Sequence, residues 1–280
     1  MSRKEKFAEI ALTVVGLTSV AVLALIIFFI FKEGSPALAH VGLGRFVGGT
    51  RWSPGKGQFG ILPMIVGSFF VTFGALLTGV PLGLGCALYL SEFAPRKTAA
   101  VLKPLVEILA GIPSVVFGFI GLTVIVPLIR DHLGGPGFSV LASAIVLGVM
   151  ILPTMVSISY DALRAVPQVY REGMLAVGAN QWQTVTSVVL PAARPGILAA
   201  GILSMGRAVG ETMAVIMVAG NATIIPVSFL DPVRTLTSNI ALEMGYATGL
   251  HRQALFATGI VLFVIIGALN ILARAFIRSR

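Results

Sequence analysis

Two oppositely charged residues stand four positions apart inside an apolar stretch, residues 195–220. They are Arg207 and Glu211, and small residues flank both of them. Residues four apart share one face of a helix, so we expect the two side chains to be neighbours. An arginine at the centre of a bilayer costs roughly 2.5–3.5 kcal/mol on insertion scales, and its planar guanidinium suits phosphate-like oxyanions. The spacing therefore predicts a polar point on a substrate path. The alternative is a self-neutralising pair that only holds helices together.

A hydroxyl in another apolar stretch is a third candidate for this path. Ser114 directly follows Pro113, with Gly111 and Gly118 nearby. Because proline lacks a backbone donor and its ring crowds the preceding turn, we expect a kink or a break in the helix here. The Ser114 hydroxyl either lines the path or bonds back to a carbonyl of its own helix, which is the commoner arrangement.

A polar segment without charge, residues 173–193, lies in the second half of the chain. Its apolar residues recur at spacings of three and four and predict one face of a single helix over residues 168–190: Leu175, Gly178, Trp182, Val185 and Val189. Pro167 precedes this helix, and Pro191 is expected to end it. Composition leaves two interpretations open, an amphipathic helix in the lipid headgroups and a helix that docks into a groove of another protein.

The spacing of Glu172, Gly178, Leu190 and Pro191 resembles the cytoplasmic signature of ABC-importer permeases. In that family the segment is a short coupling helix that docks on the ATPase subunit. Where the family has two alanines after the glutamate, this chain has Gly173 and Met174. The resemblance implies an ATPase-coupling surface made by Glu172, Gly178, Trp182, Leu190 and Pro191.

Four further motifs resemble those of the phosphate-importer permease family, and specifically of its C-type subunit. They occur in order within residues 52–220 and are Phe59–Pro63, Phe93–Arg96, Gly111–Gly118 and Gly206–Val215. The resemblance implies that Arg207 and Glu211 govern the passage of phosphate. It also implies the partners of such a permease: a second, A-type permease, two copies of an ATP-binding subunit and an extracytoplasmic phosphate-binding protein.

The elements that must position these residues are transmembrane helices. Of the 280 residues, 56% are hydrophobic and only 11% are charged, whereas a soluble domain has about 25% charged residues. Apolar stretches of about 20 residues can cross a bilayer as helices. Six such spans are predicted: residues 10–31, 57–91 with the helix starting near Leu62, 108–129, 133–160, 195–220 and 253–273.

The predicted fold is therefore all-α, a polytopic bundle of six transmembrane helices with the coupling helix between the fourth and the fifth. The resemblance makes it an ABC type I importer permease. A glycine-rich segment, residues 33–61, separates the first span from the others. We therefore expect two units, an N-terminal helix with an extracytoplasmic segment at residues 1–61, and a five-helix permease core at residues 62–280.

The distribution of lysine and arginine predicts the orientation in the lipid bilayer. With six spans both termini lie on one side, and that side carries 12 of these cations against 7 on the other. Because positively charged loops stay in the cytoplasm, we expect both termini inside a bacterial cell, although the first opposite loop carries four cations. The first apolar run, 22 residues long, exceeds the roughly 7–15 residues of a signal-peptide core, so we expect an uncleaved helix.

Charged residues near the cytoplasmic helix ends are expected to form ordinary interfacial ion pairs with neighbours in the sequence. The expected pairs are Glu92 with Lys97, Glu107 with Lys103, and Asp161 with Arg164.

Several classes of function do not fit the sequence. The scattered cations argue against nucleic-acid binding, and the single cysteine, Cys86, provides no disulfide or metal framework. The only Gly-Lys pair, Gly55–Lys56, does not fit a phosphate-binding loop. We therefore expect a non-catalytic subunit without cofactor or metal, driven by a partner that hydrolyses ATP. Two alternatives stay open: a permease for molybdate, sulfate or phosphonate, and a gradient-driven transporter or channel without an ATPase.

Overall fold

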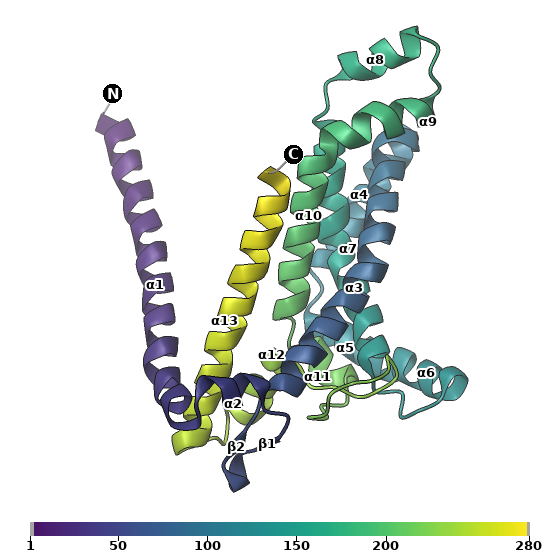
Figure 1. Ribbon diagram of the computed structural model, residues 1–280. Helices are drawn as coiled ribbons and strands as arrows, with labels where there is room; N and C mark the ends of the chain where they lie inside the picture. Colours follow the sequence, from purple (N-terminus) through teal and green to yellow (C-terminus); the bar gives the residue numbers. More distant parts are fainter. Residues whose placement is uncertain (1–2, 279–280) are drawn as a thin grey trace.

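The structure, a computed structural model that describes residues 3–278, is mostly helical (Figure 1). Six helical runs are long and apolar enough to cross a membrane: Glu9–Val41, Leu62–Phe93, Ser114–Leu133, Val140–Arg164, Gln181–Gly210 and Gly249–Ala273. The predicted all-α bundle of six spans is thus confirmed. Arg280, one of the cations used to predict the orientation, lies outside the described residues.

Three of the spans are single helices: α1 (Arg3–Val41), α7 (Val140–Arg164) and α13 (Gly249–Arg278). The other three each include a π-helical turn. They are α3 (Leu62–Leu88) with η2 (Tyr89–Phe93); α5 (Ser114–Ile120) with η3 (Gly121–Ile125) and α6 (Val126–Leu133); and α9 (Gln181–Thr184) with η4 (Val185–Val189) and α10 (Leu190–Gly210). Shorter elements join them: α2 (Leu43–Gly48), β1 (Trp52–Ser53), η1 (Pro54–Lys56), β2 (Gln58–Phe59), α4 (Arg96–Ala110), α8 (Gln168–Ala176), α11 (Met213–Val218) and α12 (Leu236–Glu243). We call the end of the bundle that carries α8 and α9 the inner end, and the opposite end the outer end (Figure 1).

Four spans differ by six or more residues from a predicted bound. The fourth span starts at Val140 instead of residue 133. The first helix continues past residue 31, through Pro36, to Val41. The third run starts at Ser114, because α4 ends at Ala110 and the next three residues interrupt the helix. Pro113 therefore marks a break in the chain of helices and not a kink. The fifth run starts earlier than predicted, at residue 181, and ends at residue 210 instead of 220.

Each π-helical turn ends two residues before a proline. The turns η2, η3 and η4 precede Pro95, Pro127 and Pro191. A proline cannot donate a backbone hydrogen bond, and its ring clashes with the carbonyl four residues earlier. A wider π turn relieves this conflict, so the helices continue through Pro127 and Pro191. The prediction that Pro191 ends the coupling helix is therefore wrong, because Pro191 lies in the first turn of α10.

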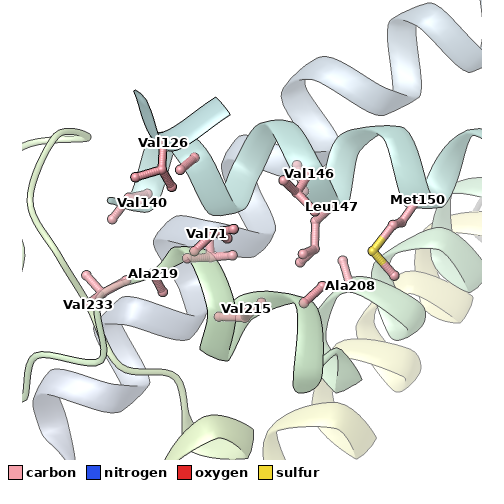
Figure 2. Close-up of a cluster of buried hydrophobic side chains, with 14 of the residues drawn as sticks. Val71, Val126, Val140, Val146, Leu147, Met150, Ala208, Val215, Ala219 and Val233 are labelled. Carbon is pink, nitrogen blue, oxygen red and sulfur yellow. The ribbon is translucent and has the colours of Figure 1, made fainter. Parts of the chain in front are cut away.

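The core of the bundle forms where α3 and α7 run side by side in the same direction. Gly74 packs against Ala144, and Gly83 packs against Met155, so the two backbones approach closely. Helices α10 and α11 complete this core with buried residues of their own. Figure 2 shows the resulting cluster of apolar side chains, which come from α3, α6, α7, α10, α11 and the loop before α12.

Helix α1 stands apart from the bundle over most of its length (Figure 1). Nearly all of its side chains between residues 9 and 29 are exposed. It meets α13 toward the outer end, where Gly34 packs against Ala257 and the rings of Phe29 and Phe256 lie 5.6 Å apart. An apolar helix that its own chain leaves uncovered needs lipid or another subunit around it.

The outer end is held together by a buried carboxylate, Glu243 at the end of α12. Its Oε1 accepts a hydrogen bond from Arg234 at 2.6 Å, and its Oε2 lies 2.8 Å from Nε2 of His251. The indole N–H of Trp52 in β1 donates to Oε2 of the same carboxylate at 2.9 Å. Glu243 therefore ties the β1–β2 hairpin to α12 and α13. The sequence did not predict this cluster. Arg234 and His251 are 9 and 8 residues from Glu243, but Trp52 is 191 residues away and reaches it only in the folded chain.

Candidate functional site

Arg207 lies near mid-height of the bundle. Gly196 packs directly against Ala162, which fixes the register between α10 and the antiparallel α7. Twelve residues further along α10, the same register brings Ala208 to Met150, and both belong to one buried cluster (Figure 2). Met150 lies close to the middle of α7, Val140–Arg164. The predicted depth of Arg207 therefore agrees with the packing of its helix.

The guanidinium of Arg207 points away from the core of its own chain. Arg207 is exposed, whereas its neighbour Ala208 is 4% exposed. Within residues 3–278, Arg207 forms no side-chain hydrogen bond and no ion pair. A cation at mid-height without a counter-ion in its own chain needs water or a partner subunit beside it.

Glu211 does not share a helix face with Arg207, so that prediction is wrong. Helix α10 ends at Gly210, and Glu211 has the extended backbone angles φ −68° and ψ 135°. Its carboxylate instead accepts a hydrogen bond from the backbone N–H of Ala214 at 3.2 Å, at the start of α11. Its backbone carbonyl accepts from the hydroxyl of Thr237 at 2.9 Å. In this structure, therefore, Arg207 and Glu211 do not form the self-neutralising ion pair.

Ser114 lies level with Glu211, at the start of α5. Helices α5 and α11 pack in the same direction, with Gly118 against Ala214 and Gly121 against Val218. The same register places Ser114 beside the break between α10 and α11. Among the described residues, the Ser114 hydroxyl has no hydrogen bond to its own helix, so the expected back-bonding is not found. Two helix breaks, at residues 111–113 and 211–212, thus meet at one height.

The coupling segment is a helical hairpin and not the single helix predicted over residues 168–190. Helix α8 ends at Ala176, and Gly178 has a φ of +87°, which strongly favours glycine. Asn180 then starts α9 with a capping box: its side chain accepts from the backbone N–H of Gln183, whose side chain accepts from the backbone N–H of Asn180. No atom of another segment lies within 4 Å of a Cβ added at Gly178, so this glycine makes a turn and not a close helix contact.

This geometry places the five predicted coupling residues in two different parts of the structure. Glu172, Gly178 and Trp182 lie in the hairpin of α8 and α9 and are exposed. Leu190 and Pro191 lie at the start of α10, inside the fifth span. The hairpin also exposes a continuous set of large apolar side chains at the inner end: Val169, Tyr170, Leu175, Val177 and Trp182.

An arginine anchors this hairpin to the end of α3, which the sequence did not predict. Arg171 donates to Glu92 twice, from Nε at 3.1 Å and from Nη2 at 2.7 Å. The same guanidinium donates to the backbone carbonyls of Leu163 and Val166 at 2.8 and 2.7 Å. Gln181 also donates to the backbone carbonyl of Glu92. Because Glu92 and Arg171 are 79 residues apart, no local spacing in the sequence indicates the pair.

Two of the expected interfacial ion pairs have other partners. Glu92 pairs with Arg171 instead of Lys97, and Asp161 pairs with Lys103 at 2.9 Å instead of Arg164. The pair of Glu107 with Lys103 is present at 3.7 Å. The hydrogen bond from Lys103 to Asp161 raises the pKa of the lysine, so it stays charged at physiological pH.

Comparison with known proteins points to one class of membrane protein. A family model described as "Binding-protein-dependent transport system inner membrane component" matches residues 79–280. The chain is 46% identical over 225 residues to a probable ABC transporter permease, YqgH of Bacillus subtilis, covering 79% of this chain and 73% of that protein. It is 36% identical over 266 residues to the phosphate transport system permease protein PstC of Mesorhizobium japonicum, covering 88% and 81%.

Solved structures support the same fold. A chain of a bacterial alginate ABC transporter has a TM-score of 0.71 at 16% identity, covering 99% of this chain and 96% of that one. A chain of the MetNI methionine ABC transporter has a TM-score of 0.62 at 21% identity, covering 78% and 96%. The fold is therefore that of the multi-pass permeases of ABC type I importers. The chain belongs to the family of binding-protein-dependent transport system inner membrane components, and within it to the PstC-like phosphate permeases.

Proposed function

We propose that this chain is the C-type permease subunit of an ATP-driven importer of inorganic phosphate and forms half of its translocation path. The relationship to phosphate permeases over most of the chain supports the substrate. The single observation that carries the proposal is the place of Arg207, an exposed guanidinium near mid-height of a membrane-spanning bundle. Such a group suits an oxyanion that passes between this chain and a second permease.

The residues around Arg207 have complementary roles in this path. The guanidinium donates to the phosphate oxygens, and the N-terminal ends of α5 and α11 lie at the same level. Ser114 stands at the first of these helix ends and can donate its hydroxyl. The carboxylate of Glu211 limits the net positive charge, so that the anion passes and is not held.

The coupling hairpin transmits the movement of the ATPase to this path. Its exposed apolar residues and Trp182 dock into a groove of the ATP-binding subunit. Because α9, η4 and α10 form one uninterrupted run, Gln181–Gly210, a displacement of Trp182 moves the helix that carries Arg207. The two residues are separated by about 38 Å along the helix axis. The Arg171–Glu92 pair couples the same movement to α3.

The rest of the assembly follows from the surfaces that this chain leaves open. An A-type permease covers the face that exposes Arg207, and two ATP-binding subunits hydrolyse ATP, so this subunit is itself non-catalytic and needs no cofactor. An extracytoplasmic phosphate-binding protein docks at the outer end. Both termini and the coupling hairpin lie in the cytoplasm. Lipid surrounds the bundle, and nucleic acid is not a partner.

Uptake by the reconstituted complex tests this proposal. The complex that co-purifies with the tagged chain is placed in vesicles with its binding protein, and labelled phosphate uptake is measured with and without ATP. We expect ATP-dependent uptake that unlabelled phosphate competes for, while sulfate, molybdate and phosphonate do not. Competition by one of those anions instead would assign the permease to that oxyanion, and uptake without ATP would indicate a gradient-driven carrier.

A further inference from the structure

A hollow of about 330 Å³ lies at the inner end, where the end of α3, the start of α4 and the end of α7 meet. Its lining includes three cations, Arg96, Lys103 and Arg164, and apolar residues such as Leu90 and Ala94. Arg96 belongs to one of the phosphate-permease motifs, and neither the path nor the coupling hairpin uses it. A hollow lined by both cationic and apolar residues suits a ligand with an anionic head and an apolar body.

The charge of this hollow is not balanced by the chain itself. Lys103 is 2.9 Å from Asp161 and 3.7 Å from Glu107, so its charge is locally compensated. Arg96 and Arg164 are exposed and have no hydrogen bond or ion pair within residues 3–278. Two guanidinium groups are therefore free to bind an anion, and each can present paired donors to phosphate oxygens.

The position of the hollow points to the membrane surface. On the side of α4 that faces away from the hollow, Val101, Leu105 and Ile108 are exposed and follow one another at spacings of four and three residues. Tyr160 lies under the ammonium of Lys103, 4.4 Å from Nζ to the ring centroid, and tyrosine is enriched at membrane–water interfaces. An exposed apolar helix face fits contact with lipid, so α4 places the hollow beside phospholipids, which carry both an anionic phosphate and acyl chains.

We propose that this hollow binds the phosphate of an anionic phospholipid headgroup between Arg96 and Arg164, with the acyl chains along the apolar part of its lining, which includes Ala100 and Pro104. Basic pockets between transmembrane helices on the cytoplasmic side bind such headgroups. The inference rests on the proposed function only for the orientation in the membrane. It adds a lipid site next to the coupling machinery, because Arg164 and Ser91 also line the hollow beneath α8 and α9 that contains Arg171 and Glu92.

Native mass spectrometry of the co-purified complex tests the site without any measurement of transport. The delipidated complex is mixed with equal amounts of phosphatidylglycerol and phosphatidylcholine that carry the same acyl chains. We expect the wild-type complex to retain phosphatidylglycerol preferentially. The double variant Arg96→Gln/Arg164→Gln should lower that retention roughly 25-fold, since each guanidinium in contact with the headgroup contributes about fivefold. The variant Arg96→Lys/Arg164→Lys should lose less of the bound phosphatidylglycerol, because it keeps both positive charges.

The matched control is Lys97→Gln. Lys97 neighbours Arg96 on α4 and is exposed, but it does not line the hollow. Retention should fall less than about twofold in this variant, because one screened surface charge contributes little. Equal losses in Lys97→Gln and the double variant would overturn the proposal in favour of general surface attraction.

Displacement of the lipid by millimolar inorganic phosphate would make the site one for the free anion. Unchanged lipid retention in the double variant, with loss of the ATP-binding subunit from the same spectra, would assign the arginines to the ATPase instead.

Discussion

Arg207 is the residue on which the proposed path depends most. A charge near the middle of a membrane-spanning bundle is costly, and the expected compensation by Glu211 is not present, since Glu211 caps α11 instead. Its exposed position leaves two sources of stabilisation, water in a path and a partner subunit. The proposed transporter provides both, which is why we place Arg207 on its path.

Replacement of Arg207 by glutamine should abolish phosphate uptake. Glutamine keeps a similar length but lacks the charge and the planar fork that bind an oxyanion. We expect labelled uptake by reconstituted vesicles to fall at least about a hundredfold, which corresponds to the loss of roughly 2.7 kcal/mol of interaction with the passing anion. The complex should still assemble, because Arg207 makes no contact that holds the fold.

Arg130→Gln serves as the control for this variant. Arg130 is an exposed cation at the end of α6 that pairs with its neighbour Asp131 at 3.2 Å. Uptake by the control should stay close to that of the wild type. Normal uptake by Arg207→Gln would remove Arg207 from the path.

Glu243 is expected to matter for stability and not for transport chemistry. Its carboxylate is almost fully buried and receives Arg234, His251 and Trp52 together. Glu243→Gln leaves the partly buried guanidinium of Arg234 without its counter-ion, and breaking a fully buried pair in this way typically costs about 3–5 kcal/mol, which is an upper limit here. We expect the midpoint of thermal unfolding of the detergent-solubilised complex to fall by roughly 5 °C or more.

The exposed pair of Arg130 and Asp131 provides the comparison for Glu243. Asp131→Asn removes the acidic partner of an ion pair whose side chains are 56% and 59% exposed, and such pairs contribute at most about 1 kcal/mol. Its unfolding midpoint should stay near that of the wild type. Equal midpoints for Glu243→Gln and Asp131→Asn would show that the Glu243 cluster does not hold the outer end together.

At the scale of elements, the coupling hairpin depends on the turn between α8 and α9. Gly178→Ala places a side chain at a φ of +87°, which costs roughly 1–2 kcal/mol in the left-handed region. The hairpin should shift, and ATP hydrolysis by the reconstituted complex should lose most of its stimulation by the loaded binding protein. The measurement is the ratio of stimulated to basal hydrolysis.

Gly173→Ala is the matched control for the hairpin turn. Gly173 lies inside α8, its φ is not positive, and no atom lies within 4 Å of an added Cβ. Alanine favours a helix over glycine, so the stimulation ratio should remain at the wild-type level. A Gly178→Ala complex with full stimulation would show that the turn tolerates a side chain and that coupling does not depend on its shape.

The elements also show which parts of this fold the sequence could predict. Charge-free runs and glycine or proline breakers predicted six spans and the interruption near Pro113, because those signals are local. The sequence did not predict the end of α10 at Gly210, since no proline marks the break at residues 211–212 and the hydroxyl of Thr237, 26 residues from Glu211, helps to hold it. The anchor between Arg171 and Glu92 was missed for the same reason, because its partners meet only in the folded bundle.

At the scale of the whole molecule, this chain is one part of a larger assembly. Helix α1 leaves its apolar surface uncovered, Arg207 faces outward near mid-height, and α8 and α9 present exposed apolar side chains at the inner end. Each of these surfaces is unfavourable for an isolated subunit. Together they fit lipid around α1, a second permease beside α10 and an ATPase under the coupling hairpin.

The most direct test of the central claim is purification of the tagged chain from native membranes, with identification of the subunits that accompany it. The account predicts a second permease and an ATP-binding subunit in the purified complex, with the ATP-binding subunit cross-linked from a probe placed at Trp182. It also predicts that phosphate uptake stops when ATP is depleted. A chain that purifies alone, with uptake that survives ATP depletion, would contradict the account and make Arg207 part of a gradient-driven carrier or channel.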